Sequence, residues 1–176
     1  MNNGSFTYKD YHRLYRSGKI HSNYFDVKQI QPSSVDLTLS EECYEIEASF
    51  LSSSKNVREN LKLLQLKKIN LNKKYIFKKN KTYLVKLNEN LAISKNMFGI
   101  CNPKSSTGRL DVFCRTILNH SNEYEKIPNG YKGEMFIEIT SKSFNIEFKK
   151  GDSLNQMRLI YNKRVYLTDN FLRNFH

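Results

Sequence analysis

The chain has 176 residues, of which 39% are hydrophobic. At this length and hydrophobic content it can bury one good core but is short for two, so we expect a single domain over residues 1–176. No stretch approaches the roughly 20 consecutive apolar residues of a membrane-spanning helix, and Met1 to Phe6 has neither a basic region nor an apolar signal core, so we expect a cytoplasmic protein without a membrane partner. The net charge of +12 attracts nucleic acids and small anions alike, so motifs must decide between them.

The first predicted elements are a helix and a strand. Thr7 and Asp10 have capping-box spacing, and Gly18 stands where a helix would stop, which predicts a short helix over residues 7–17. After it, apolar and polar residues alternate from Val35 to Leu39, which predicts a half-buried strand.

The rest of the chain is predicted to be mostly β. One inserted helix is expected over Val57 to Leu66, and Thr168 could cap a last helical turn that ends at Phe175. Many short strands with frequent turns predict a sandwich or distorted barrel over about residues 30–161, followed by a tail over 162–176. The strand-like runs are Cys43–Ala48, Tyr75–Phe77, Thr82–Leu87, Phe98–Cys101, Val112–Leu118, Glu134–Thr140, Phe144–Phe148 and Leu154–Ile160.

The densest polar cluster, Asn102 to Arg109, supplies two cations, three hydroxyl groups and a flexible glycine directly after a strand-like run. Lysine offers a point charge, arginine a fork of fixed donors, and hydroxyl groups and turn amides complete an anion site, so the loop suits phosphate. It lacks the GxxxxGK[ST] spacing of a Walker loop, and an ordinary surface turn is the alternative.

A second cluster contains a glutamate in an apolar strand. Alternation places Phe136, Glu138 and Thr140 on one face and the apolar residues Met135, Ile137 and Ile139 on the other. Glu138 is therefore either a solvent-facing strand glutamate or a general base that activates water.

The cysteines give no sign of a metal site. Cys43, Cys101 and Cys114 are odd in number and no two are spaced as CxxC, so we expect reduced, buried thiols and no zinc.

Four segments, in the right order over most of the chain, resemble the motifs of dCTP deaminases in the dUTPase superfamily. Ile30–Leu39 is similar to the IQPxSxDLxL segment, and Lys104–Leu110 to the nucleotide-binding [RK]SSxxRL motif. Gly130–Glu138 resembles GxxGxxxxE, and Gly151–Leu159 resembles the closing G-x4-Q-x2-[LIF] strand. The resemblance is greatest to the first half of the longer, two-domain dCTP deaminases.

The resemblance implies a distorted, jelly-roll-like β barrel that assembles as a homo-oligomer, a trimer with active sites between subunits. It implies deamination of dCTP to dUTP without zinc, in which Glu138 moves protons and Ser105 and Arg109 act as catalytic residues at the phosphates and the attacking water. Magnesium would be bound through the triphosphate rather than by a protein cage. The remaining residues expected to bind substrate are Lys104, Ser106, Thr107, Gly108, Asp36, Gln156 and Tyr131.

The chain departs from the family pattern in three places. Ile127 to Gly130 reads IPNG where relatives have IDPG, 21 positions separate Arg109 from Gly130, and the tail lacks the residues that close over nucleotide in many relatives. Base recognition therefore stays open.

Three other functions remain possible. The first is a dUTPase or a bifunctional dCTP deaminase and dUTP diphosphatase, which would share the phosphate loop. The second is a non-catalytic nucleotide-binding subunit, or a half-site that needs a partner domain. The third is a nucleic-acid-binding module, motivated by aromatic residues interleaved with lysines between Lys67 and Lys86; solvated strand faces explain that pattern as well, and we expect no nucleic-acid partner.

Overall fold

The computed structural model describes residues 3–162 and 168–174 of the chain. The tail predicted over 162–176 is therefore described only in part. Its helical turn is present as α4 (Asp169–Arg173), directly after Thr168, while the predicted end at Phe175 lies outside the described residues. No helix in the described ranges is both long and apolar enough to cross a membrane.

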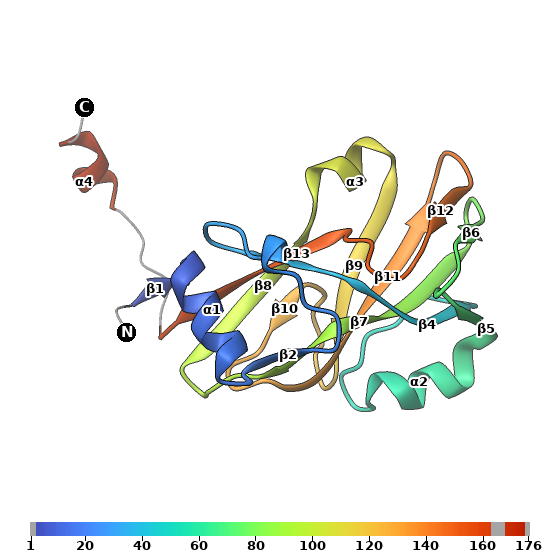
Figure 1. Cartoon of the computed structure of the whole chain (residues 1–176), viewed down its shortest axis with the longest axis horizontal. Coiled ribbons are helices and arrows are strands. Elements are labelled where there is room, and N and C mark those ends of the chain that lie inside the picture. The colour runs from blue at the N-terminus through green and yellow to red at the C-terminus, as the bar shows by residue number, and fades with distance from the viewer. Residues whose placement is uncertain (1–2, 163–167, 175–176) are drawn as a thin grey trace.

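Two antiparallel sheets packed face to face form the body of the molecule (Figure 1). The five-stranded sheet contains β1 (Gly4–Ser5), β13 (Asn155–Tyr161), β8 (Met97–Pro103) and β10 (Lys126–Ile127) in that order, with β3 (Val35–Leu37) also paired to β13. The six-stranded sheet contains β5 (Gln65–Asn70), β4 (Leu39–Ile46), β7 (Thr82–Ala92), β11 (Lys132–Ser141) and β9 (Val112–Leu118), with β2 (Ile20–Ser22) also paired to β7. A small ribbon pairs β6 (Tyr75–Phe77) with β12 (Ile146–Phe148).

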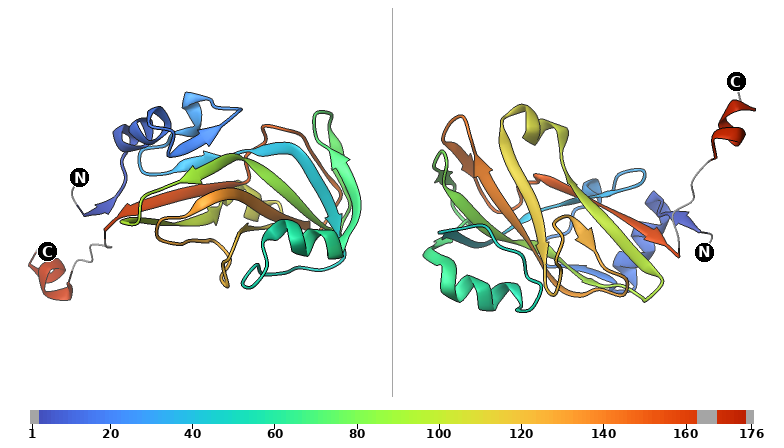
Figure 2. Two further views of the ribbon diagram at one scale, coloured as in Figure 1. Left: turned by 90° about the horizontal axis from the view of Figure 1, so that it is seen from below. Right: turned by 180° about the vertical axis from the view of Figure 1, so that it is seen from behind.

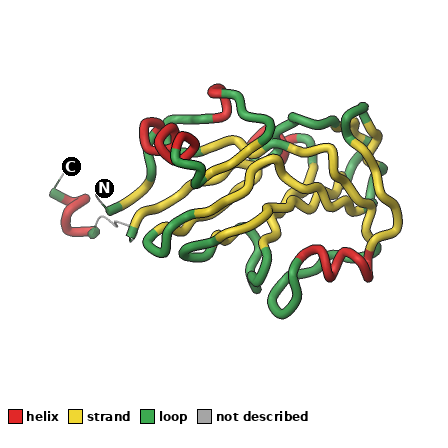
Figure 3. Tube along the Cα trace, turned by 60° about the horizontal axis from the view of Figure 1, so that its bottom comes forward, coloured by secondary structure: helices red, strands yellow, loops and turns green. Residues whose placement is uncertain are grey.

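The helices are short and lie around the sheets (Figure 3). They are α1 (Tyr8–Arg16), the 3₁₀ turn η1 (Val27–Gln29), α2 (Val57–Leu64), α3 (Ser105–Arg109) and α4. Seen from below, α1 and α2 lie on opposite sides of the sheets (Figure 2, left). The prediction of a mostly β, distorted barrel with a few short helices is confirmed.

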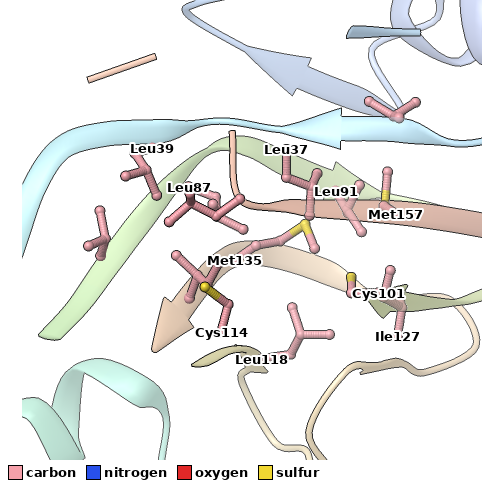
Figure 4. Close-up of a cluster of buried hydrophobic side chains, with 14 of the residues drawn as sticks. Leu37, Leu39, Leu87, Leu91, Cys101, Cys114, Leu118, Ile127, Met135 and Met157 are labelled. Carbon is pink, nitrogen blue, oxygen red and sulfur yellow. The ribbon is translucent and has the colours of Figure 1, made fainter. Parts of the chain in front are cut away.

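One core fills the space between the two sheets because alternate side chains of each strand point inward (Figure 4). Leu37 and Met157 enter it from the five-stranded sheet, and Leu87 and Met135 from the six-stranded sheet; each of these side chains is fully buried. All three cysteines are free and buried, as predicted.

Helix α1 begins and ends where the sequence predicts. The hydroxyl group of Thr7 donates to Asp10 Oδ2 at 2.7 Å, and the same oxygen accepts the Thr7 backbone N–H at 3.0 Å, which completes a capping box. Gly18 has φ +68°, a left-handed conformation that favours glycine and ends the helix.

Helix α2 is shorter than predicted, and the prediction of a helix to Leu66 is wrong at its end. Leu66 belongs to β5, whose backbone pairs with β4. Only Val57 and Leu61 of the helix are buried, whereas Leu63 and Leu66 are exposed, so nothing on the last turn gains from staying helical. The free edge of β4 supplies hydrogen-bond partners instead.

A buried glutamate on β7 holds the residues on both sides of β3. Glu89, on β7, has no exposed surface, and it accepts hydrogen bonds from Gln29 Nε2 at 2.8 Å, Thr38 N at 3.0 Å and the Thr38 hydroxyl group at 2.9 Å. Burial raises the pKa of Glu89 to about 7. These contacts fix the position of the strand that carries Asp36.

A second, smaller core lies on the outer face of the six-stranded sheet, under α2. Its buried members are Tyr44, Ile46, Val57, Leu61, Leu84, Ile117 and Phe136. Arg58 joins α2 to the six-stranded sheet, because its guanidinium bonds Glu42 Oε1 at 2.8 Å and Glu134 Oε2 at 2.6 Å. Lys86 also pairs with Glu134, at 3.0 Å. Hydrogen bonds from Arg58 lower the pKa of Glu134 to about 2.

We expect Arg58→Ala to lower the free energy of unfolding by about 1–2 kcal/mol at pH 7, because the half-exposed arginine loses packing as well as screened ion pairs. A carboxyl group with a lowered pKa stabilises the fold above the pKa of the unfolded chain and loses this effect as pH falls toward its folded value. The difference between the two proteins should therefore shrink from pH 4.5 toward pH 2. Urea unfolding at pH 7, 4.5 and 3 measures it, and a difference that does not change with pH would contradict the assignment.

Candidate active site

Glu138 lies near the centre of β11, opposite Leu84 of β7 and Arg115 of β9. It shares the outer face of the six-stranded sheet with Phe136, as the alternation predicts. Met135, Ile137 and Ile139 point into the main core on the other face. The alternative of a solvent-facing glutamate does not hold, because only 4% of Glu138 is exposed. A buried carboxylate in a strand needs a partner or a function.

The two oxygens of the Glu138 carboxylate have different surroundings. Oε1 accepts hydrogen bonds from Arg115 Nη2 at 2.6 Å and Arg115 Nε at 3.2 Å. Oε2 is buried and accepts no hydrogen bond from any residue that the structure describes. Since buried acceptors are nearly always satisfied in proteins, Oε2 has the properties of an atom that receives a donor from outside the chain.

Two segments cover this carboxylate. Residues 47–56 follow β4, and residues 119–125 follow β9; they meet at an isolated bridge between Ser52 and Ser121. Arg115 Nη2 donates to the Ser49 hydroxyl group at 3.2 Å, and the Arg115 guanidinium lies 4.1 Å from the centre of the Tyr124 ring. Glu138 is buried because these side chains lie around it.

The predicted phosphate loop, Lys104 to Arg109, contains the short helix α3, which follows β8. Ser105, Ser106 and Arg109 are exposed, and within the described part of the chain their side chains make no hydrogen bond or ion pair. Thr107, by contrast, is 3% exposed, and its hydroxyl group donates to the Leu154 carbonyl at 3.0 Å. Three of the polar side chains are thus free for a ligand, and the roles of Thr107 and Gly108 in binding stay predictions.

Asp36 and Gln156 form a cluster with the start of this loop. They lie directly opposite each other on β3 and β13, and Gln156 Oε1 accepts a hydrogen bond from the Ser34 hydroxyl group at 3.3 Å. Lys104 Nζ lies 2.5 Å from Asp36 Oδ2. Val35, which neighbours Asp36, is buried in the main core, so this cluster projects from the outer face of the five-stranded sheet.

Tyr131 lies apart from the other predicted site residues. Its hydroxyl group donates to the Glu134 carbonyl at 2.6 Å and accepts the Asn119 N–H at 3.2 Å, and burial raises the pKa of Tyr131 to about 12. The ring also packs against Gly133, where an added Cβ would lie 3.2 Å from the Tyr131 hydroxyl oxygen. Here Tyr131 holds the turn before β11, and its contact with substrate stays a prediction.

The structure therefore brings the predicted residues together in two groups on opposite faces. The group around Asp36 and Gln156 faces outward from one sheet, and Glu138 faces outward from the other, with the main core between them. Sheets that pack face to face lie about 10 Å apart, and outward side chains add to that separation.

Sequence reasoning missed two residues beside Glu138, namely Arg115 and Tyr124. Alternation within Val112–Leu118 does place Arg115 on the same face as Phe113 and Ile117, away from the core. The pairing of β9 with β11, which the sequence does not show, is needed to place Arg115 opposite Glu138. Nothing in the sequence of the segment 119–125 indicates where Tyr124 lies.

Comparison with known families decides what these motifs belong to. Residues 2–163 match the family described as the 2'-deoxycytidine 5'-triphosphate deaminase (DCD) N-terminal domain. The chain belongs to this dCTP deaminase family. Glu138, the phosphate loop, Asp36 and Gln156 all lie within the matched range.

A solved structure of the dCTP deaminase from Agrobacterium tumefaciens is similar over the whole chain. It has 32% sequence identity and a TM-score of 0.95, with 100% of this chain and 53% of that protein covered. The chain thus spans about half the length of that dCTP deaminase. A comparison with the sequences of curated proteins finds no significant match.

Two dUTPases are more distant. The dUTPase of EIAV has 20% identity and a TM-score of 0.41, covering 58% of this chain and 82% of that one. A dUTPase of the Staphylococcus bacteriophage 80alpha has 13% identity and a TM-score of 0.41, covering 55% of this chain and 76% of that one.

Among the described residues, no group of three or more His, Cys, Asp or Glu side chains is arranged to hold a metal ion.

Proposed function

We propose that the chain catalyses the hydrolytic deamination of dCTP to dUTP, with Glu138 as the residue that moves protons. The observation that carries this proposal is the Glu138 carboxylate, which is buried, anchored through Oε1, and left with an unpartnered Oε2. Membership in the dCTP deaminase family supports the choice of substrate.

The reaction requires one water molecule and one proton carrier. The water oxygen bonds to C4 of cytosine while Glu138 accepts a proton from the water. Glu138 passes this proton to N3, which receives the electron pair of the C4=N3 bond, and then takes the proton of the new hydroxyl group and gives it to the amino group. The C4–N4 bond breaks and ammonia leaves, so that C4=O and N3–H of uracil form, and dCTP and water give dUTP and ammonia. Oε2 is the oxygen of Glu138 available for this transfer.

The triphosphate is proposed to bind at α3. Ser105, Ser106 and Arg109 offer two hydroxyl groups and a guanidinium without partners in the described structure, and Lys104 adds a positive charge beside Asp36. Magnesium accompanies the substrate, because its preferred ligands here are the phosphate oxygens.

The active site is proposed to lie between copies of the chain in a homo-oligomer, as a trimer. The reason is the placement of Asp36 and Gln156 on one outer face and of Glu138 on the other. A neighbouring copy that presents its phosphate loop to Glu138 completes the site, since in a closed ring each subunit gives one face and receives the other.

A half-site that needs a partner domain is the second candidate. It is supported by the coverage of 53% of the dCTP deaminase from Agrobacterium tumefaciens, which is about twice as long as this chain. The turn Ile127–Gly130 gives a further reason, because it lacks the aspartate of IDPG. The Asn129 side chain in this turn donates to the Lys95 carbonyl at 3.1 Å, so it is engaged within the fold.

The test is incubation of the purified, metal-stripped chain with dCTP and magnesium, with ammonia release followed and dUTP separated from dUMP by chromatography. We expect dUTP and ammonia in equal amounts. Formation of dUMP would indicate a bifunctional deaminase and diphosphatase, and no product from a chain that still binds dCTP would indicate the half-site.

A further inference from the structure

Both hydrogen bonds that Arg115 makes to Glu138 go to the same carboxylate oxygen, which is unusual for an arginine fork. Nη2 and Nε both bond Oε1, and Oε2 is left without a donor. Arg58 of α2 offers a comparison, because it pairs with Glu134 on the same strand as Glu138. Its Nε bonds Glu134 Oε2 at 2.6 Å and its Nη2 bonds Glu134 Oε1 at 2.8 Å. The second arrangement satisfies both oxygens, as expected for a pair that only stabilises the fold.

The position of the Arg115 guanidinium is itself fixed from two sides. The Tyr124 ring lies against it at 4.1 Å, and the Ser49 hydroxyl group accepts a bond from Nη2 at 3.2 Å. Tyr124 is held in turn, because its hydroxyl group donates to the Phe50 carbonyl at 3.3 Å. A cation over an aromatic ring gains electrostatic energy, more so when it is partly removed from water.

We propose that Arg115 is a positioning residue, which anchors Oε1 of Glu138 so that Oε2 alone faces the reacting groups, and that Tyr124 holds Arg115 in that position. The donor that Oε2 receives is then the attacking water or the amino group of cytosine, both of which carry the required hydrogen. This proposal rests on the proposed function, since it assigns a role within that reaction.

The segments 47–56 and 119–125 gain a role from this arrangement. Val57 N donates to Asn119 Oδ1 at 2.9 Å, and Ser52 and Ser121 form a bridge, so the two segments are joined beside Glu138. Together they supply Ser49 and Tyr124, the side chains that fix Arg115.

The experiment compares Arg115→Ala, Arg115→Lys and Tyr124→Ala with the unaltered chain in steady-state deamination of dCTP. We expect Arg115→Ala to lower kcat by about 100-fold while KM changes by less than about threefold, because a misdirected carboxylate slows proton transfer without removing a contact to the nucleotide. Arg115→Lys should recover part of the loss, and Tyr124→Ala should lower kcat by about tenfold. Guanidinium ions at millimolar concentration should restore activity to Arg115→Ala by occupying the vacated position.

Arg58→Ala is the matched control. Arg58 and Arg115 have the same side-chain exposure, 43%, and each pairs with a glutamate of β11. Arg58→Ala should lower stability, leave kcat of the folded protein unchanged, and show no response to guanidinium.

The outcomes separate this proposal from the proposed function. If the unaltered chain deaminates dCTP but Arg115→Ala keeps kcat within threefold, the positioning role is wrong and the function stands. An increase in KM at constant kcat would make Arg115 a substrate-binding residue and overturn the proposal as well. If the unaltered chain does not deaminate dCTP either as a homo-oligomer or together with a partner domain, the proposed function itself is wrong.

Discussion

Replacing Glu138 with glutamine will lower kcat for dCTP deamination by at least about 1,000-fold and leave the affinity for dCTP within about tenfold. Glutamine has nearly the same volume and keeps an oxygen for Arg115, so the buried site remains filled. It has no carboxylate to accept a proton from water, so the step that Oε2 performs is lost.

Ammonia release under saturating dCTP measures the loss, and equilibrium binding of dCTP measures the retained affinity. The matched control is Glu134→Gln, four residues earlier on the same face of β11, where the carboxylate is ion-paired to Arg58 and Lys86. That variant should be less stable and equally active per folded molecule. Turnover of Glu138→Gln within tenfold of the unaltered chain would remove Glu138 from the reaction.

Mixing two inactive variants will restore activity if the site lies between copies of the chain. Glu138→Gln lacks the proton carrier, and Arg109→Ala lacks the exposed guanidinium of the phosphate loop, which should cost both binding and turnover. When the two are refolded together in equal amounts, about a quarter of the sites combine an intact Glu138 from one copy with an intact Arg109 from another. Activity should rise to about that fraction of the unaltered level.

The readout is deaminase activity of the mixture against each variant alone at the same total concentration. A double variant that carries both substitutions, mixed with the unaltered chain, is the control for exchange of subunits. If the two single variants exchange subunits but stay inactive, Glu138 and Arg109 act within one copy, and the two-face arrangement is not the reason for assembly.

The sequence predicts strands well where alternation is strict. Both β6 and β9 begin and end as predicted, and the face of β11 that carries Glu138 is correct, because period-two patterning is set by the single core between the sheets. The predicted end of α2 is wrong, because the last residues assigned to the helix belong to β5, which pairs with β4. Pairing between strands that are distant in the sequence leaves no local signal in the sequence.

The candidate site divides in the same way. Motifs locate Glu138 and the loop that carries Arg109, because both lie in short segments whose residue types and spacing resemble those of dCTP deaminases. Burial of Glu138 was not predictable, since it depends on Arg115 and Tyr124, which reach the carboxylate through strand pairing and a loop. The separation of the two groups onto opposite faces likewise follows only from the packing of the sheets.

Glu89 and Glu134 make folding a proton-linked process in opposite senses. Glu89 has a pKa of about 7 in the folded state, so at pH 6 it holds a proton that the unfolded chain has already released, and folding takes up a proton. The stability that Glu89 contributes is fully present below pH 4.5 and is lost as the pH rises through 7. Glu134, with a pKa of about 2, gives stability that increases from pH 2 to about 4.5. As far as these two groups decide it, the chain is most stable in mild acid, and it becomes easier to open as the solution approaches neutrality.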